Sequence, residues 1–212
     1  LITPRTSPCS STVSDAARNA AIAVARTVTV VDTTAPIITR TGDHNITHEA
    51  ATTFTDPGVT AIDTLNGNLT ANVVTTGTVD INTPGTYTLT YTVSDAAGNA
   101  AASVTRNVTV EDTTAPVITR TGGQNVTHEA ATSYTDPGAT ANDTLDGNIT
   151  ARVLTTGTVD INTPGTYTLT YTVSDAAGNA AASVTRNVTV VDTTAPIITR
   201  TGDQNVTHEA AT

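Results

Sequence analysis

The sequence predicts an all-β protein of tandem antiparallel β-sandwiches, with about seven strands in each sandwich and a period of 80 residues. The first observation is a repeat: DTTAPIITR begins at Asp32 and again at Asp192, and DTTAPVITR begins at Asp112. Residues 32–111 and 112–191 differ at 13 of 80 aligned positions. The second observation is a strict alternation of apolar residues with threonine, which is typical of half-buried strands.

The period divides the 212 residues into four parts. Residues 1–31 match the C-terminal part of a repeat, 32–111 and 112–191 are complete repeats, and 192–212 match the N-terminal part of another. Turns and strands all lie inside one period, so we expect each repeat to fold alone, as one bead of a string. Because the chain does not begin with Met, we expect it to be an excerpt of a longer protein.

The clearest strand within a repeat covers residues 86–93, where Tyr87, Leu89, Tyr91 and Val93 face one side and four threonines the other. A turn at Gly98 follows, and the chain returns as an antiparallel partner over 102–110. Pro-Gly pairs predict two more turns. Further strands are expected at 36–40, 44–48, 59–62, 69–74 and 78–81.

Differences between the two repeats predict which positions are buried. Arg106 falls among the apolar positions of its strand, so we expect either a bulge that redirects it or a side chain that reaches solvent at the core edge. Ile62 becomes Asn142 and is expected to be exposed. Positions that stay apolar despite changing are expected in the core, in both repeats; in the first they are Ile37, Ile46, Phe54, Leu69 and Val74.

The charge balance excludes several classes of protein. The net charge is −10, and all nine basic residues are arginine. A nucleic-acid-binding face needs clustered positive charge, as does a polybasic membrane patch, so neither partner is expected. No apolar run approaches the roughly 20 residues that span a bilayer. The single cysteine, Cys9, excludes an internal disulfide framework and a thiolate zinc cluster.

Two motifs carry a resemblance to a known family. Gly85-Thr86-Tyr87-Thr88-Leu89 resembles the immunoglobulin F strand, in which Tyr87 and Tyr167 would be tyrosine-corner residues. The linker DTTAP and the hairpin TYTVSDAAGNAA resemble bacterial immunoglobulin-like surface domains related to the hyalin repeat. The resemblance implies tandem immunoglobulin-like modules, an extracellular or cell-surface location and no reaction.

Acidic residues are expected to gather where a linker enters a repeat, beside the loops that follow the third and sixth strands. Converging oxygen ligands suit Ca²⁺, whereas the alternative is ordinary capping of turns by Asp and Asn. The second set carries more charge and is expected to bind more strongly. The candidate ligands are Asp32, Asp63 and Asp95 in the first repeat, and Glu111, Asp112, Asp143, Asp146 and Asp175 at the second.

Other candidate sites are weaker. His48 and Glu49 are neighbours on a strand and point to opposite faces, so they are interpreted as exposed strand residues and not as a metal site. The same holds for the pairs at 128–129 and 208–209. Cys9 has no histidine–carboxylate partners for nucleophilic catalysis.

The sequence therefore favours a structural spacer, or stalk, in a bacterial cell-surface or secreted adhesin-like protein, possessing no enzyme activity. Calcium at the junctions would stiffen it, and neighbouring repeats would be its partners. Two alternatives stay open: a multivalent module that binds glycan or protein, and accessory repeats of a secreted enzyme.

Overall fold

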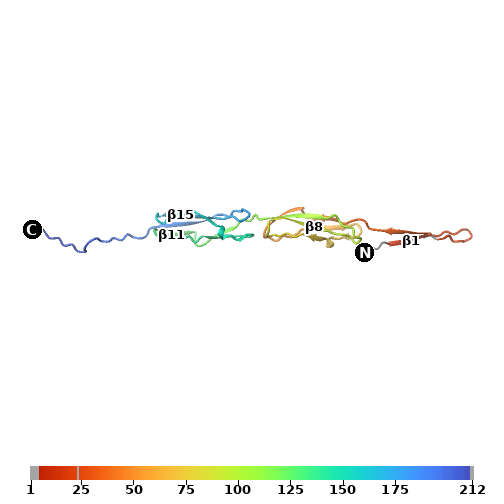
Figure 1. The fold of residues 1–212 in the computed structure, drawn as a ribbon, viewed down its shortest axis with the longest axis horizontal. Coiled ribbons are helices and arrows are strands. Elements are labelled where there is room, and N and C mark those ends of the chain that lie inside the picture. Colours follow the sequence, from red (N-terminus) through yellow and green to blue (C-terminus); the bar gives the residue numbers. More distant parts are fainter. Residues whose placement is uncertain (1–4, 23, 211–212) are drawn as a thin grey trace. The chain divides into compact units, whose positions relative to one another are not determined.

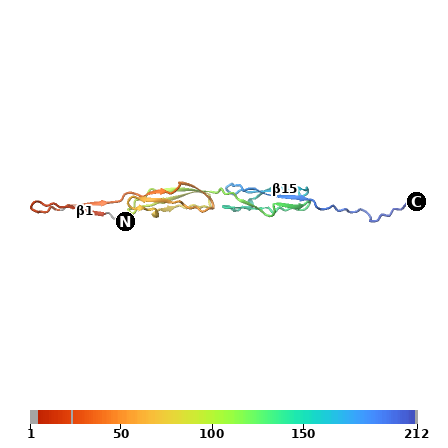
Figure 2. The ribbon, with the colours of Figure 1, turned by 180° about the vertical axis from the view of Figure 1, so that it is seen from behind.

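The computed structural model describes residues 5–22 and 24–210, and its contacts divide the chain into two compact units, 1–113 and 114–212. Each unit contains one complete repeat folded as a two-layered sandwich of seven strands (Figures 1 and 2). The first consists of β3 (Ile37–Arg40), β4 (Asn45–Glu49), β5 (Val59–Asp63), β6 (Gly67–Asn68), β7 (Val74–Thr76), β8 (Gly85–Thr92) and β9 (Val104–Glu111).

The second repeat has the same seven strands, one period further along the chain. A three-stranded sheet, in the order β10-β12-β13, faces a four-stranded sheet, in the order β11-β16-β15-β14, and the first repeat has the equivalent order. The strands are β10 (Val117–Arg120), β11 (Asn125–Glu129), β12 (Ala139–Asp143), β13 (Gly147–Asn148), β14 (Leu154–Thr156), β15 (Gly165–Thr172) and β16 (Val184–Val191). The predicted seven-stranded immunoglobulin-like sandwich is thus confirmed.

One pairing departs from the antiparallel arrangement. β4 pairs with β9 in parallel, from Asn45 opposite Asn107 to Glu49 opposite Glu111. Backbone bonds extend this ladder at both ends, because Asn107 N donates to His44 O at 2.9 Å and Ala50 N to Glu111 O at 2.8 Å. An early strand is therefore fixed along the last strand of the same repeat.

The apolar core lies between the two sheets. In the first repeat it contains Ile38, Ala61, Leu89, Tyr91 and Val93, all of them buried. Residues at the same positions, together with Ile149, form the core of the second repeat. Because each cluster is internal to one repeat, each sandwich has its own source of hydrophobic stability.

Arg106 lies inside the core and does not reach solvent. Its exposed fraction is 0%, and its register opposite Leu89 is regular, so both predicted outcomes, the bulge and the extended side chain, are wrong. Nη1 forms an ion pair with Asp56 at 3.1 Å, and Nη2 donates to the carbonyl oxygens of Thr41 (2.6 Å) and Gly58 (3.1 Å). A buried guanidinium requires such partners.

A tyrosine hydroxyl completes this buried polar group. Tyr91 OH donates to both carboxylate oxygens of Asp56 at 2.9 Å. Burial, together with the bonded carboxylate, raises the pKa of Tyr91 to about 12. The second repeat has the same arrangement in Tyr171, Asp136 and Arg186.

The tyrosine corner is confirmed. Tyr87 OH donates to Thr83 O, and Tyr167 OH to Thr163 O, both at 2.7 Å. Each bond joins a strand to the turn that precedes it, so it fixes the corner at which the chain enters β8 or β15.

Two strand predictions are wrong. Residues 69–74 contain the 3₁₀ helix η1 (Thr70–Asn72), because Thr70 Oγ1 accepts from Ala61 N at 3.0 Å and Asn68 Oδ1 accepts from Thr70 N at 2.9 Å. Such local side-chain bonds compete with a β-ladder. The second repeat has the equivalent η2 (Thr150–Arg152). Residues 78–81 form no strand, since Asp80 caps a turn instead.

Burial predictions fail at two of the five changing positions. Ile37 and Val74 are 72% and 57% exposed, and their counterparts Val117 and Leu154 are exposed as well. By contrast, Ile149 is 5% exposed, as expected of a core residue. Both repeats have an apolar residue at these two positions because strands favour such residues on either face of a sheet, so apolar character there does not indicate burial.

Outside the complete repeats, the N-terminal segment forms a hairpin and the C-terminal segment forms no strand. β1 (Arg5–Ser11) pairs with β2 (Val24–Val30) in the register that β8 and β9 have, from Arg5 opposite Val30. Residues 192–210 are exposed and without strands. In a complete repeat the partners of these residues come later in the sequence, as β5 and β9 do.

Candidate functional site

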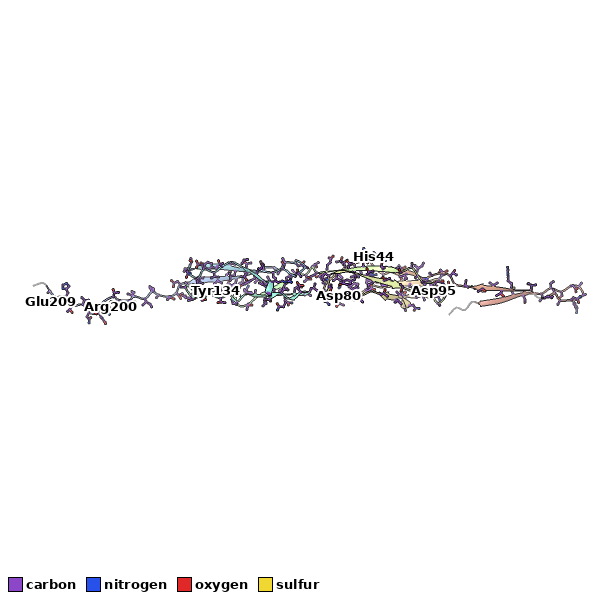
Figure 3. All side chains as sticks on the ribbon, in the orientation of Figure 1. His44, Asp80, Asp95, Tyr134, Arg200 and Glu209 are labelled. Atoms are coloured by element: carbon purple, nitrogen blue, oxygen red, sulfur yellow. The ribbon has the colours of Figure 1, made fainter. Side chains whose placement is uncertain are left out.

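Three aspartates meet where the chain enters the first complete repeat. Asp32 lies in the linker, Asp63 ends β5, and Asp95 lies in the turn after β8. One carboxylate oxygen of each lies within 4.8 Å of those of the other two. Asp63 is 3% exposed and Asp95 is 8% exposed. Figure 3 places Asp95 at one end of the first sandwich and Asp80 at the other.

Turn capping accounts for part of this arrangement. Asp63 Oδ2 accepts from Leu65 N at 2.8 Å and from Asn66 N at 2.7 Å. Both oxygens of Asp95 accept from Asn99, through its backbone N and its Nδ2, each at 2.7 Å. Burial raises the pKa of Asp95, but these bonds outweigh it and hold the pKa below its ordinary value.

The same turn holds the incoming linker. Asn99 Nδ2 also donates to Asp32 O at 3.2 Å, and Asp32 Oδ1 accepts from Thr34 N at 3.1 Å. The backbone of the linker is therefore attached to the loop between β8 and β9.

Two oxygens of this cluster, Asp32 Oδ2 and Asp63 Oδ1, are buried without a hydrogen-bond partner. The same is true of Oδ1 of Asn66, whose backbone N donates to Asp63. Among the described residues, the arginine–carboxylate pairs use Asp56, Asp136 and Asp146, and none includes an aspartate of the cluster. The cluster thus concentrates negative charge with no arginine to balance it.

At the second repeat, Asp143 and Asp175 keep the burial of Asp63 and Asp95, at 2% and 7% exposed. Asp143 Oδ2 caps the same turn through Leu145 N (2.7 Å) and Asp146 N (3.0 Å). Glu111 and Asp112 belong to the first compact unit, so the meeting of all five residues stays a prediction.

Asp146 has a partner that the sequence pattern did not predict. Its Oδ2 accepts from Arg152 Nη1 at 3.1 Å and from Ala176 N at 2.7 Å. Asn66 and Asn72 occupy these two positions in the first repeat, so the two substitutions introduce opposite charges that pair. The extra carboxylate expected to strengthen the second site is partly neutralised by Arg152. The signal available in the sequence was the change of both Asn66 and Asn72 to residues of opposite charge in the second repeat.

A second functional feature lies at the end of β4. His48 and Glu49 were expected to be exposed, but both are half-buried, and that prediction is wrong. Glu49 Oε1 accepts from Thr113 N at 3.1 Å, and its Oε2 from Thr113 Oγ1 at 2.6 Å. The ring of His48 packs edge-on against Phe54, with ring centroids 5.1 Å apart.

Glu129 makes the equivalent contact in the second repeat. It accepts from Thr193 N (2.9 Å), Thr193 Oγ1 (2.7 Å) and Thr194 Oγ1 (2.8 Å). The bond from the Thr193 hydroxyl is the main cause that holds the pKa of Glu129 below its ordinary value. The signal in the sequence was the spacing between this glutamate and the threonine of the next linker, which is the same in both repeats.

The two sandwiches, each with its own core and with its linkers bonded to side chains of the fold, define a tandem array of immunoglobulin-like modules. The bacterial surface protein, Ig-like domain family matches residues 38–110 and 118–190. The chain belongs to this family. Among the described residues, no helix is long and apolar enough to cross a membrane.

Relatives support the same placement. Hyalin from Strongylocentrotus purpuratus is 35% identical over 189 residues, which is 82% of this chain and 15% of hyalin. Hyalin from Lytechinus variegatus is 38% identical over 56% of this chain and 24% of that protein. The chain thus spans less than a quarter of the length of these relatives. Family and relatives together locate the segment outside the cell or at its surface.

A solved structure is also similar. The lipoprotein BT2262 from Bacteroides thetaiotaomicron is 34% identical over 38% of this chain and 40% of that chain, with a TM-score of 0.34.

Proposed function

We propose that this segment is a spacer of an adhesin-like surface protein, in which consecutive repeats are coupled by linkers that are bonded to the fold at both ends. The observation that carries the proposal is the attachment of the outgoing linker by Glu49 to Thr113, repeated by Glu129 to Thr193. A flexible Gly/Ser linker would make no such contacts and would let the repeats move independently.

The linker that enters the first complete repeat supports the same function. Asn99 Nδ2 donates to the backbone oxygen of Asp32, so the linker that enters the first repeat is bonded to that repeat, as the linker that leaves it is bonded through Thr113. Pro36 follows the linker and fixes one backbone dihedral. Each contact removes freedom from the few residues between the sandwiches, which makes a stalk of many repeats stiffer than one with free joints. Calcium bound at Asp32, Asp63 and Asp95 would add a further constraint at the entry.

Distance measurements between spin labels test the coupling. Labels on cysteines introduced at Thr75 and Thr155, with Cys9→Ser, report the distance between the two repeats, since both threonines are exposed. We expect a narrow distribution that broadens in Glu49→Ala. The control is Glu209→Ala, which changes the same motif in the exposed C-terminal segment and should leave the distribution unchanged.

A distribution in the unchanged protein as broad as that obtained after inserting a Gly/Ser linker would contradict the proposal. A glycan array probed with residues 32–192 tests the competing binding function. Specific, concentration-dependent hits would favour a multivalent glycan-binding module over a spacer.

A further inference from the structure

We propose that Asp32, Asp63 and Asp95, with the amide oxygen of Asn66, form a Ca²⁺ site that attaches the incoming linker to two loops of the first complete repeat. The inference deepens the proposed spacer function by naming the ion and the ligands at its junction. It rests on four side chains from three separate segments of the chain.

The ligand atoms are already oriented toward one another. One oxygen of each of the three carboxylates lies within 4.8 Å of those of the other two, although the linker and the two loops that carry them are well separated in the sequence. Turn capping explains why an aspartate occupies each position. It uses both oxygens of Asp95, but only Oδ2 of Asp63 and Oδ1 of Asp32. The oxygens that capping does not use are the buried ones without partners.

Because the oxygens that capping does not use are buried, they point to a bound ion. Asp63 is 3% exposed, and its Oδ1 has no hydrogen-bond partner. An ionised oxygen removed from water and left without a partner is strongly destabilising, so native proteins pair such groups or bind an ion to them. Asp32 Oδ2, in the same cluster, is also buried without a partner, as is Oδ1 of Asn66, whose backbone N bonds to Asp63; one cation would serve all three oxygens.

The chemistry of the cluster selects the ion. All candidate metal ligands are carboxylate or amide oxygens, which hard cations prefer. Zinc sites in proteins use mainly Cys and His. The cluster combines three carboxylates with one amide, and water would fill the remaining positions of the 6–8 that Ca²⁺ takes. Mg²⁺ is smaller and demands near-octahedral geometry, so we expect it to bind less well. Modules outside the cell bind Ca²⁺ with a Kd of about 10⁻⁴–10⁻³ M, which is the range expected here.

The test is a Ca²⁺ titration of the whole 212-residue chain followed by NMR. Amide signals of Leu65 and Asn66 differ from those of the second repeat because Asp146 replaces Asn66 there. We expect these signals to shift with Ca²⁺ in the millimolar range and less with Mg²⁺. Asp63→Asn should weaken the response by at least about tenfold, since one charged ligand is lost while the amide oxygen can still cap the turn.

Asp80→Asn is the matched control. Asp80 also caps a turn, accepting from Asn82 N at 2.9 Å, and it lies at the opposite end of the sandwich (Figure 3). This variant makes the same change of charge and should leave the Ca²⁺ response intact.

Three outcomes would overturn the site: no shift up to several millimolar Ca²⁺, an undiminished shift in Asp63→Asn, or an equal loss in Asp80→Asn. Dispersed amide signals in each variant show that it is folded. The spin-label distances in Glu49→Ala are measured without calcium, so the spacer proposal can fail or survive separately from the cation site.

Discussion

Replacing Tyr171 by Phe should destabilise the second repeat more than the same replacement at Tyr167, although each removes one hydroxyl group. Tyr171 OH donates to both oxygens of Asp136, at 2.8 and 2.9 Å, and Asp136 in turn pairs with the fully buried Arg186. Tyr167 OH donates to the neutral carbonyl of Thr163, in an exposed setting.

The magnitudes follow from the charge of the acceptor. A hydrogen bond to a charged group contributes about 1.5–3 kcal/mol to stability, and one between neutral groups about 0.5–1.5 kcal/mol. The side chain of Asp136 is 23% exposed and can recruit water, which favours the lower end, about 1.5–2 kcal/mol, for Tyr171→Phe. Water can also replace the lost donor at Thr163, so we expect about 0.5–1 kcal/mol for Tyr167→Phe. In a domain of this size, 1 kcal/mol corresponds to about 4–8 °C in Tm.

Urea unfolding of residues 112–194 measures both variants in the same background. The slope m should stay constant, so that the midpoints report stability alone. Tyr171→Ala, which also removes the ring from the core, should cost about 3–5 kcal/mol. If Tyr171→Phe is no more destabilising than Tyr167→Phe, then the buried carboxylate does not depend on the tyrosine, and the reasoning fails.

Three further predictions concern the same repeat. Residues 112–194 should give a dispersed NMR spectrum in isolation, because their core is internal, and a disordered-type spectrum would refute the bead model. Stability should fall with acid below the ordinary glutamate pKa of about 4.3, because the lowered pKa of Glu129 favours the folded state only while the carboxylate is ionised. Melts at stepped pH should show a shallower fall in Glu129→Gln, and an identical fall would exclude this carboxylate as a cause. Gly157→Ala should destabilise by well over about 1 kcal/mol, since its Cβ would lie 2.2 Å from Thr168 O. Gly178→Ala is the control for melts, with a similar φ of +97° against +94° but open space around it, and equal losses would rule out the clash.

The repeat and its alternating strands were predictable because they depend on local pattern. The long strands β8 and β9 and the tyrosine corner follow from period-two alternation and from one short motif. The segment at 69–74 was not predictable in this way, because the hydroxyl of Thr70 bonds to the backbone of Ala61, in a neighbouring strand. A propensity scale contains no such contact.

Contacts between residues that lie far apart in the sequence were mostly not predicted. Arg106 and Asp56 lie far apart in the sequence, so the position of Arg106 among apolar residues did not reveal that Asp56 would pair with it in the core. The partner of Glu49 lies beyond the end of its own repeat, at Thr113. The grouping of Asp32, Asp63 and Asp95 was accessible, since strand order alone assigns linker and loops to the same end of a sandwich.

The parallel pairing of β4 with β9 decides how a repeat responds to tension. When the chain is pulled from its two ends, the force reaches β4 from its N-terminal side and β9 from its C-terminal side. Because the two strands run in the same direction, they are pulled past each other along their length, and the ladder from Asn45 to Glu49 is loaded all at once. An antiparallel pair pulled at adjacent ends would instead open one bond after another. The bonds from Glu49 to Thr113 continue the loaded ladder into the linker, so we expect this pair to resist extension together with the pairing of β3 and β5.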